Sequence, residues 1–122
     1  MATVRYLVHD VDAAVAFYTQ RLGFTVQQQF GPTIAILVRG DLKLWVAGPS
    51  ASAARPMPDG RKPEPGGWNR FVIEVGDLDA LVTQLRGAGV PFRNDIVSGP
   101  GGKQILCEDP SGNVVELFQP AA

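Results

Sequence analysis

The stretch EDPSGNVVELFQP, residues 108–120, carries one carboxylate inside an otherwise apolar run. Glu116 lies between Val115 and Leu117, where the apolar pattern predicts a buried strand. A buried carboxylate without a partner is unstable, so Glu116 needs a cation, a metal ion or a hydrogen-bonding ligand beside it. The identity of this partner is the main functional question that the sequence raises.

Few other side chains offer a recognisable reaction chemistry. His9 is the single histidine and Cys107 the single cysteine, so an internal disulfide and a cysteine cluster for zinc are both excluded. We expect Cys107 to be a small hydrophobic residue of a strand; a reactive thiol is the alternative. No serine lies in an elbow motif that would make a triad with His9. The glycines of SGPGGK, residues 98–103, lead into a strand, which favours a hairpin turn over a phosphate-binding loop.

Length, composition and charge exclude several classes of protein. The 122 residues, 45% hydrophobic and 19% charged, fit one compact domain or two small halves that share a core. A formal net charge of −1 leaves no basic surplus for nucleic acid or an anionic membrane. The opening MATVRYLVHD reaches charged residues too early for a signal peptide, and no apolar run approaches the roughly 18 residues of a membrane span. We therefore expect a cytoplasmic protein without nucleic-acid or membrane partners.

The chain contains an internal repeat. YLVHDVDAAVAFY at residues 6–18 aligns with IEVGDLDALVTQL at residues 73–85, so that Asp10 matches Asp77, 67 positions later. Each copy predicts a strand, an aspartate that caps a helix, and an amphipathic helix that ends at glycine. The expected helices span residues 11–22 and 78–88.

Each predicted helix is preceded by one strand and followed by three, which gives the order β-α-β-β-β twice. The expected strands cover residues 3–9, 24–30, 33–39 and 42–47 in the first module, 1–47, and residues 70–75, 91–97, 103–108 and 113–118 in the second module, 68–122. Between the modules, GPSASAARPMPDGRKPEPGG at residues 48–67 holds five prolines and four glycines without periodicity. This segment is either a linker or a lid that contacts a ligand.

The doubled order, together with DVDAAVAFYTQRLGF (10–24), EVGDLDALVTQLRGAGV (74–90) and EDPSGNVVELFQP (108–120), resembles the vicinal oxygen chelate superfamily. This superfamily includes glyoxalase I, bleomycin-resistance proteins and extradiol dioxygenases. The resemblance implies an α+β fold, a single domain over residues 1–122 in which two βαβββ modules form curved mixed sheets around a cavity. It also implies a homodimer, with modules paired within a chain or swapped between chains. One scaffold hosts many functions, so the resemblance says more about fold than about activity.

Metal-dependent members of this superfamily place ligands at the start of each module's first strand and inside each module's last strand. Carried over to this sequence, these positions are Thr3, Leu44, Arg70 and Glu116. Only Glu116 binds a metal in the usual way, because leucine cannot ligate, threonine is a weak ligand and arginine brings a fixed positive charge. We therefore expect no cofactor and no metal at this site, with Glu116 as the one protein ligand if a divalent metal does bind.

The same placement suggests a partner for Glu116. The first and last strands of a module lie side by side in this fold, which puts Arg70 and Glu116 on one face. A guanidinium can hold a carboxylate bidentately, so we predict an ion pair where a metal-dependent relative would hold half of its metal site. The pair either serves structure alone or orients a polar group of a ligand.

Strand parity assigns further residues to the predicted cavity, which is apolar with a few polar groups, as a small-molecule site requires. The expected ligand-contacting residues are Thr3, Arg5, Leu7, Leu42, Leu44, Val46, Trp68, Arg70, Val72, Glu74, Val114, Glu116 and Phe118. Trp68 either stacks on a planar ligand or anchors the loop, and His9 is either a strand-end residue or a ligand contact. Trp45 has the opposite parity from Leu44, which predicts packing against the helix.

Three functions fit these expectations. The preferred one is a metal-free protein that binds or sequesters a hydrophobic or planar organic molecule, as bleomycin-resistance-like members do. The second is a metal-dependent glyoxalase-like lyase or isomerase, or a dioxygenase, in which the metal polarises oxygens and Glu116 as the catalytic carboxylate moves the proton. The third is metal-free catalysis in which Arg70 holds an anionic substrate and Glu116 or Glu74 is the base. The missing metal ligands favour the first.

Overall fold

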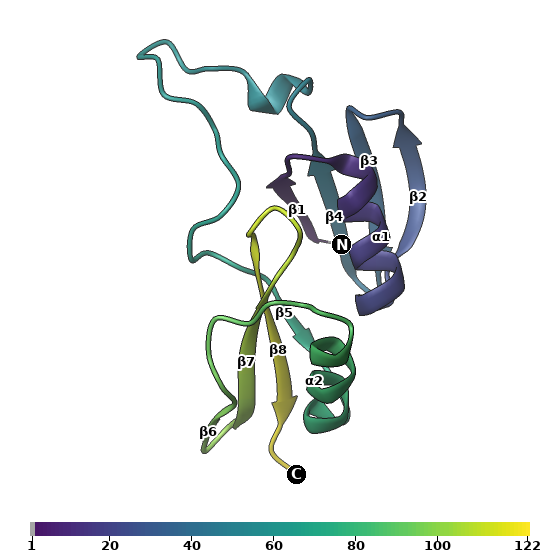
Figure 1. The fold of residues 1–122 in the computed structure, drawn as a ribbon, viewed down its shortest axis with the longest axis vertical. Helices are drawn as coiled ribbons and strands as arrows, with labels where there is room; N and C mark the ends of the chain where they lie inside the picture. The colour runs from purple at the N-terminus through teal and green to yellow at the C-terminus, as the bar shows by residue number, and fades with distance from the viewer. Residues whose placement is uncertain (1) are drawn as a thin grey trace. The chain divides into compact units, whose positions relative to one another are not determined.

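The computed structural model describes residues 2–122, which form two compact units (Figure 1). Unit 1 contains the described residues up to Gly66 together with the turn Pro110–Asn113; unit 2 contains Gly67–Asp109 and Val114–Ala122. In each unit the described residues build one α-helix and one four-stranded mixed sheet. The predicted α+β fold, with β-α-β-β-β order in both halves, is confirmed.

The sheet of unit 1 has the strand order β1-β4-β3-β2, with β1 and β4 parallel and the other neighbouring strands antiparallel. Asp10 caps the helix as expected, because its carboxylate accepts from the backbone N–H of Ala13, and the helix ends at Gly23 in the left-handed region (φ 75°). Its elements are β1 Ala2–Leu7, α1 Val11–Leu22, β2 Thr25–Phe30, β3 Ile34–Arg39, β4 Leu42–Ala47 and the short 3-10 helix η1 Ser52–Ala54.

Helix α1 covers one face of this sheet (Figure 1). Leu37 and Leu44 are fully buried neighbours across β3 and β4, and Tyr18 of α1 is fully buried with them in the core. The Tyr18 ring meets the rings of Phe17 and Phe24 edge to face, at 5.0 and 5.4 Å between centroids.

The side of the sheet away from α1 is called the open face of unit 1. Strand alternation places on it Thr3, Arg5, Leu7, Thr25, Gln28, Phe30, Ile34, Ile36, Val38, Lys43, Trp45 and Ala47.

Unit 2 repeats this arrangement in the order β5-β8-β7-β6, with β5 and β8 parallel. Asp77 caps α2 through Ala80, and the Gln119 amide oxygen accepts from the backbone N–H of Leu78 at 2.8 Å. Its elements are β5 Val72–Glu74, α2 Leu78–Gly87, β6 Val97–Gly99, β7 Gly102–Glu108 and β8 Val114–Pro120. The open face of unit 2, away from α2, carries Val72, Glu74, Gln104, Leu106, Glu108, Val114, Glu116 and Phe118.

The predicted strand at 91–97 is largely wrong. Phe92 forms only an isolated bridge with Cys107, and regular pairing is confined to β6. The reason is local: the Asn94 side chain takes a ladder position, with its amide oxygen accepting from the backbone N–H of Leu106 at 2.9 Å. The sequence SGPGGK makes the predicted hairpin turn, since Gly99 pairs with Gly102 across it.

None of the described helices has the length and hydrophobicity that a transmembrane segment requires.

The helix-facing side of β4 is expected to carry much of the stability of unit 1. Leu44→Ala should lower the free energy of unfolding by about 2–5 kcal/mol, because Leu44 is fully buried and its removal leaves a cavity. The matched control is Lys43→Ala, one residue away on the open face, with an expected change of about 0.5 kcal/mol or less. Urea unfolding followed by circular dichroism measures both; equal losses would contradict the assignment of the two faces.

Candidate functional site

The parallel register within each unit identifies the equivalent positions of the two halves. In unit 1, Arg5 lies opposite Trp45, and in unit 2, Val72 lies opposite Glu116. Arg5 and Val72 are themselves 67 positions apart, the offset of the repeat. The counterpart of Glu116 in unit 1 is therefore Trp45 and not Leu44.

This register corrects several expectations for the first module. Leu42, Leu44 and Val46 face the same side as Val4 and the helix, so the prediction that they share a face with Thr3, Arg5 and Leu7 is wrong. The prediction that Trp45 packs against the helix is wrong for the same reason, since the Arg5 guanidinium lies over its ring. The repeat alignment matched Glu116 with Leu44 and not with Trp45, and a shift of one residue exchanges the two faces of a strand.

On the open face of unit 1, Trp45 lies at the position equivalent to that of Glu116 in unit 2. The guanidinium carbon of Arg5 lies 4.8 Å from the centroid of its ring, a cation–π contact. The indole Nε1 is buried and has no hydrogen-bond partner among the described residues. Thr3 and Lys43 are neighbours across the same two strands. This part of the site offers an aromatic ring, two cations and a hydroxyl group.

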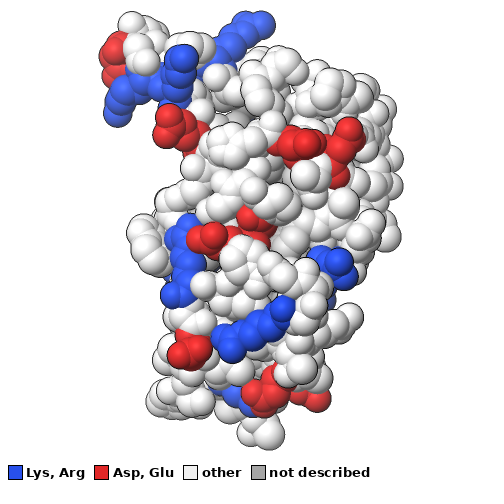
Figure 2. Space-filling view, viewed as in Figure 1, with Lys and Arg blue, Asp and Glu red and all other residues white. Residues whose placement is uncertain are grey.

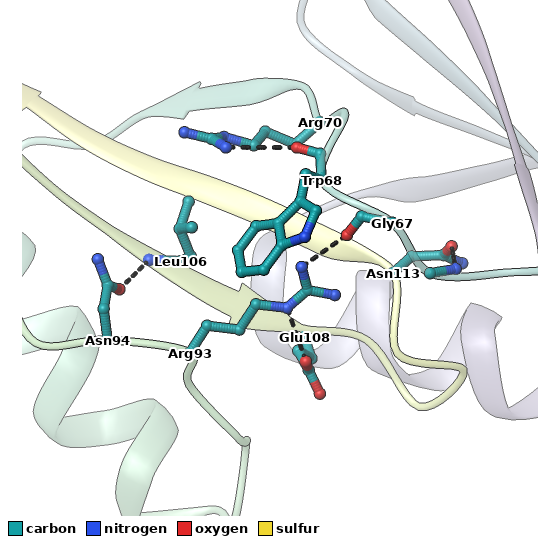
Figure 3. Close-up of polar contacts among 9 residues, drawn as sticks. Gly67, Trp68, Arg70, Arg93, Asn94, Leu106, Glu108 and Asn113 are labelled. Carbon is teal, nitrogen blue, oxygen red and sulfur yellow. Dashed lines mark hydrogen bonds and ion pairs between the residues drawn. The ribbon is translucent and has the colours of Figure 1, made fainter.

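On the open face of unit 2, the predicted pair of Arg70 and Glu116 is confirmed. Both Nε and Nη2 of Arg70 lie 3.0 Å from Oε1 of Glu116, so two nitrogens of the guanidinium contact the same carboxylate oxygen. Nη1 donates to the carbonyl oxygen of Trp68 at 3.3 Å (Figure 3). The side chain of Glu116 is 12% exposed and that of Arg70 is 30% exposed, so the pair is only partly screened by solvent.

A second ion pair on this face was missed by sequence reasoning. Nε of Arg93 donates to Oε2 of Glu108 at 2.8 Å, and Nη1 donates to the carbonyl oxygen of Gly67 at 2.6 Å. The same guanidinium lies 4.5 Å from the ring centroid of Trp68 (Figure 3). Strand alternation could have indicated it, because Glu108 of β7 and Glu116 of β8 point to the same face of the sheet. Trp68 itself is 67% exposed.

The remaining predicted residues are divided between the two units. In unit 2, Val72 is half-exposed and Glu74 exposed, Val114 is fully buried, and Phe118 lines a hollow of about 310 Å³ with the β6–β7 turn. In unit 1, Leu7 and His9 line a pocket of about 380 Å³, which the segment 48–66 closes on one side. The long segment thus forms a wall of this pocket; its predicted role as linker or lid stays a prediction.

The residues at the four ligand positions do not fit a metal centre. By the corrected register these positions are Thr3, Trp45, Arg70 and Glu116. An indole offers no ligand atom, and Arg70 binds the one carboxylate. Within residues 2–122, no three or more histidine, cysteine, aspartate or glutamate side chains gather where they could hold a metal ion.

Cys107 lies on the helix-facing side of β7 and is fully buried. Burial raises the pKa of its thiol from an ordinary 9.0 to about 12, and the nearby carboxylates of Asp109 and Glu108 contribute to the rise. The thiol is therefore protonated at neutral pH, as the expected small hydrophobic residue would be and a reactive thiol would not.

Comparisons with known proteins agree with this architecture. A family model described as the Glyoxalase/Bleomycin resistance protein/Dioxygenase superfamily matches residues 1–117. A lactoylglutathione lyase from Agrobacterium tumefaciens has a similar fold, with a TM-score of 0.75 and 22% identity over 98% of this chain and 92% of that chain. A comparison with curated protein sequences finds no match.

Two further solved structures are similar at 25% identity. A superfamily member from Sphaerobacter thermophilus DSM 20745 has a TM-score of 0.75 and covers 98% of this chain and 95% of its own. TnmS3, an antibiotic binding protein from Streptomyces sp. CB03234, has a TM-score of 0.72 and covers 98% of this chain and 93% of its own.

The Arg70 and Glu116 pair predicts an asymmetric mutational response. Arg70→Met leaves a nearly buried carboxylate without its cation and should lower the free energy of unfolding by about 1–3 kcal/mol. The double variant with Glu116→Gln should recover part of this loss, because it removes the unpaired charge. A double-mutant cycle by urea unfolding measures the coupling; a coupling energy of zero would show that the two side chains do not interact in solution.

The thiol of Cys107 should be protected in the native protein. Iodoacetamide at pH 8 is expected to label it only after unfolding in urea, because the thiol is both buried and protonated. Mass spectrometry of the intact protein before and after unfolding measures the labelling, and rapid modification of the folded chain would contradict it.

Proposed function

Because the chain belongs to the Glyoxalase/Bleomycin resistance protein/Dioxygenase superfamily, we propose that it is a small-molecule-binding protein of the bleomycin-resistance type. In this proposal it binds or sequesters a planar, hydrophobic organic ligand, and it does so without a metal ion. It acts as a cytoplasmic homodimer. The observation that carries the proposal is the replacement of possible metal ligands by an aromatic ring in one unit and by an ion pair in the other.

Trp45 supports a binding role because its ring and the Arg5 guanidinium over it form a cation–aromatic surface where a metal-dependent relative needs a ligand atom. Beside it on the open face lie Ile36 of β3 and Arg5 of β1, the residues opposite it in the two strand pairings. Aromatic rings of this kind bind planar ligands by stacking, and the apolar side chains around them remove the ligand from water.

Trp68 supports the same role in unit 2. It is 67% exposed, and the guanidinium of Arg93 lies over its ring. That guanidinium is in turn fixed by Glu108 and by the Gly67 carbonyl group (Figure 3). A ring held by such contacts loses little conformational freedom when a ligand stacks on it, which favours binding.

The two ion pairs argue against the catalytic alternatives. Arg70 already binds Glu116 and Arg93 already binds Glu108, so neither carboxylate is an unoccupied base and neither cation is an unoccupied anion site. Glu74 is exposed and takes part in none of the ion pairs that the described residues form. The relative described as an antibiotic binding protein, at 25% identity, adds weight to a binding function.

Several large apolar side chains on or near the open faces are exposed, which supports the proposed homodimer. Among the described residues these are Phe30, Val72 and Val97, each about half exposed at 51%, 50% and 51%. Apolar side chains of this size gain stability when a partner or ligand covers them.

The proposal predicts the state of the purified protein. Native mass spectrometry after expression in medium supplemented with zinc, nickel and iron should show a dimer without stoichiometric metal. Metal that the wild type retains stoichiometrically and that Glu116→Ala loses would overturn the metal-free assignment, because Glu116 is the one carboxylate at the four ligand positions.

Trp68 should contribute to the affinity for a planar ligand. N-phenyl-1-naphthylamine, a neutral planar fluorescent probe, is expected to bind saturably, and Trp68→Ala should weaken binding by about threefold to tenfold through the lost stacking. Trp68→Phe, which keeps an aromatic ring, is the matched control and should retain most of the affinity. Fluorescence titration measures all three proteins; equal affinities would exclude Trp68 from the site.

A further inference from the structure

The four strands of unit 1 carry three basic side chains and no acidic one. Arg39 faces the helix, where its Nε donates to the carbonyl oxygen of Leu22 at 2.9 Å. Arg5 and Lys43 are therefore the charged residues of the open face of unit 1. The acidic residues of this unit lie outside the strands, at Asp10, Asp12, Asp41, Asp59 and Glu64.

Neither Arg5 nor Lys43 has a carboxylate partner within the part of the chain that the structure describes. The ion pairs among residues 2–122 involve Arg61, Arg70, Arg86, Arg93 and Lys103. The contrast with unit 2 is direct, because both arginines of its open face are paired with glutamates. A cation beside apolar side chains and without a protein counter-ion attracts an anionic group from a ligand.

The indole of Trp45, at the centre of this face, is also a hydrogen-bond donor. The indole Nε1–H of Trp45 is a donor only, and it has no acceptor among the described residues. The guanidinium of Arg5 has five N–H donors, and its central carbon lies 4.8 Å from the centroid of the same indole ring. A face that supplies donors and positive charge selects oxygen acceptors with negative charge.

The same face leads into the pocket of about 380 Å³. Leu7 and Ala47 belong both to the open face and to the pocket lining, and the opposite wall includes prolines of the segment 48–66, such as Pro56 and Pro63. Leu7 is two residues beyond Arg5 on β1, a distance of about 7 Å along the strand. The volume is within the range of sites for small organic ligands.

We propose that the ligands of this protein are planar aromatic anions, with a carboxylate, sulfonate or phenolate group that Arg5 binds. Lys43 adds positive potential, and the aromatic body lies against Leu7 and Ala47 in the pocket closed by segment 48–66. The inference rests on the proposed binding function and adds to it a ligand class and a site in unit 1, separate from stacking on Trp68 in unit 2. The open face of unit 2 is not the anion site, because Glu74, Glu108 and Glu116 outnumber its two paired arginines.

Figure 2 shows basic and acidic side chains mixed on the segment 48–66. Lys62 and Glu64 both line the pocket, so the wall that this segment contributes is close to neutral. The selectivity for an anion therefore comes from the sheet and not from the segment.

Two fluorescent probes with one aromatic skeleton test the proposal. 1-Anilinonaphthalene-8-sulfonate carries a sulfonate group, and N-phenyl-1-naphthylamine lacks it. On the native, folded protein the sulfonate should bind with saturation and about fivefold to tenfold more tightly, and the advantage should shrink as salt is raised. Titration calorimetry with the same probes gives the number bound per chain.

Variants separate the anion site from a general effect of charge. Arg5→Gln should remove the higher affinity for the sulfonate probe and leave the affinity for N-phenyl-1-naphthylamine within about twofold of the wild-type value. Arg5→Lys should restore part of the higher affinity for the sulfonate. Arg21→Gln, in the last turn of α1, changes the net charge equally and should affect neither probe. Thermal unfolding of each variant checks that the fold is intact.

The outcomes distinguish the two levels of the hypothesis. If both probes bind equally, or if Arg5→Gln weakens both alike, the ligand class is wrong and the proposed binding function survives. If neither probe binds with saturation, the binding function fails as well. If Arg21→Gln lowers the sulfonate affinity as much as Arg5→Gln does, the effect is one of net charge and the site at Arg5 is refuted.

Discussion

The parallel pairing of the first and last strand in each unit is the constraint on which the rest of this structure depends. Because side chains alternate between the faces of a sheet, the register of this pairing decides which residues meet on the open face. In unit 1 it brings Arg5 to Trp45, and in unit 2 it brings Val72 to Glu116 and so Arg70 within reach. The aromatic ring of unit 1 and the ion pair of Arg70 and Glu116 both depend on these two registers.

The two units share one order of strands but differ in how the charges on their open faces are paired. In unit 2 each arginine of the open face is bound to a glutamate, so the charge is neutralised within the protein and Trp68 is fixed by Arg93. On the open face of unit 1, Arg5 and Lys43 have no carboxylate partner among the described residues, and the Arg5 guanidinium lies over the indole ring of Trp45. The repeated pattern of strands thus carries one face whose arginines are neutralised by glutamates and one face with unpaired positive charge.

The turn Pro110–Asn113 fastens the long segment to the sheet of unit 1. Asn113 is buried; its Nδ2 donates to the carbonyl oxygen of Leu7 at 2.7 Å, and its Oδ1 accepts from the backbone N–H of Gly66 at 2.8 Å. Ser111 accepts from the backbone N–H of His9 at 2.8 Å. These contacts hold the end of β1 and the end of the long segment together, which defines the wall of the pocket without a regular element in residues 55–66.

The sequence by itself determined the fold class, the repeat, both helices with their aspartate caps, and the pair of Arg70 and Glu116. These features depend on residue patterns within short segments and on one charged residue in an apolar strand, both of which can be recognised in the sequence. Only the tertiary structure decided which face of β4 is open, because LKLWVA is apolar at alternate positions of both faces and gives no signal for its register. The same holds for Arg93, whose partners Glu108 and Gly67 are distant in sequence and meet only when the strands pair.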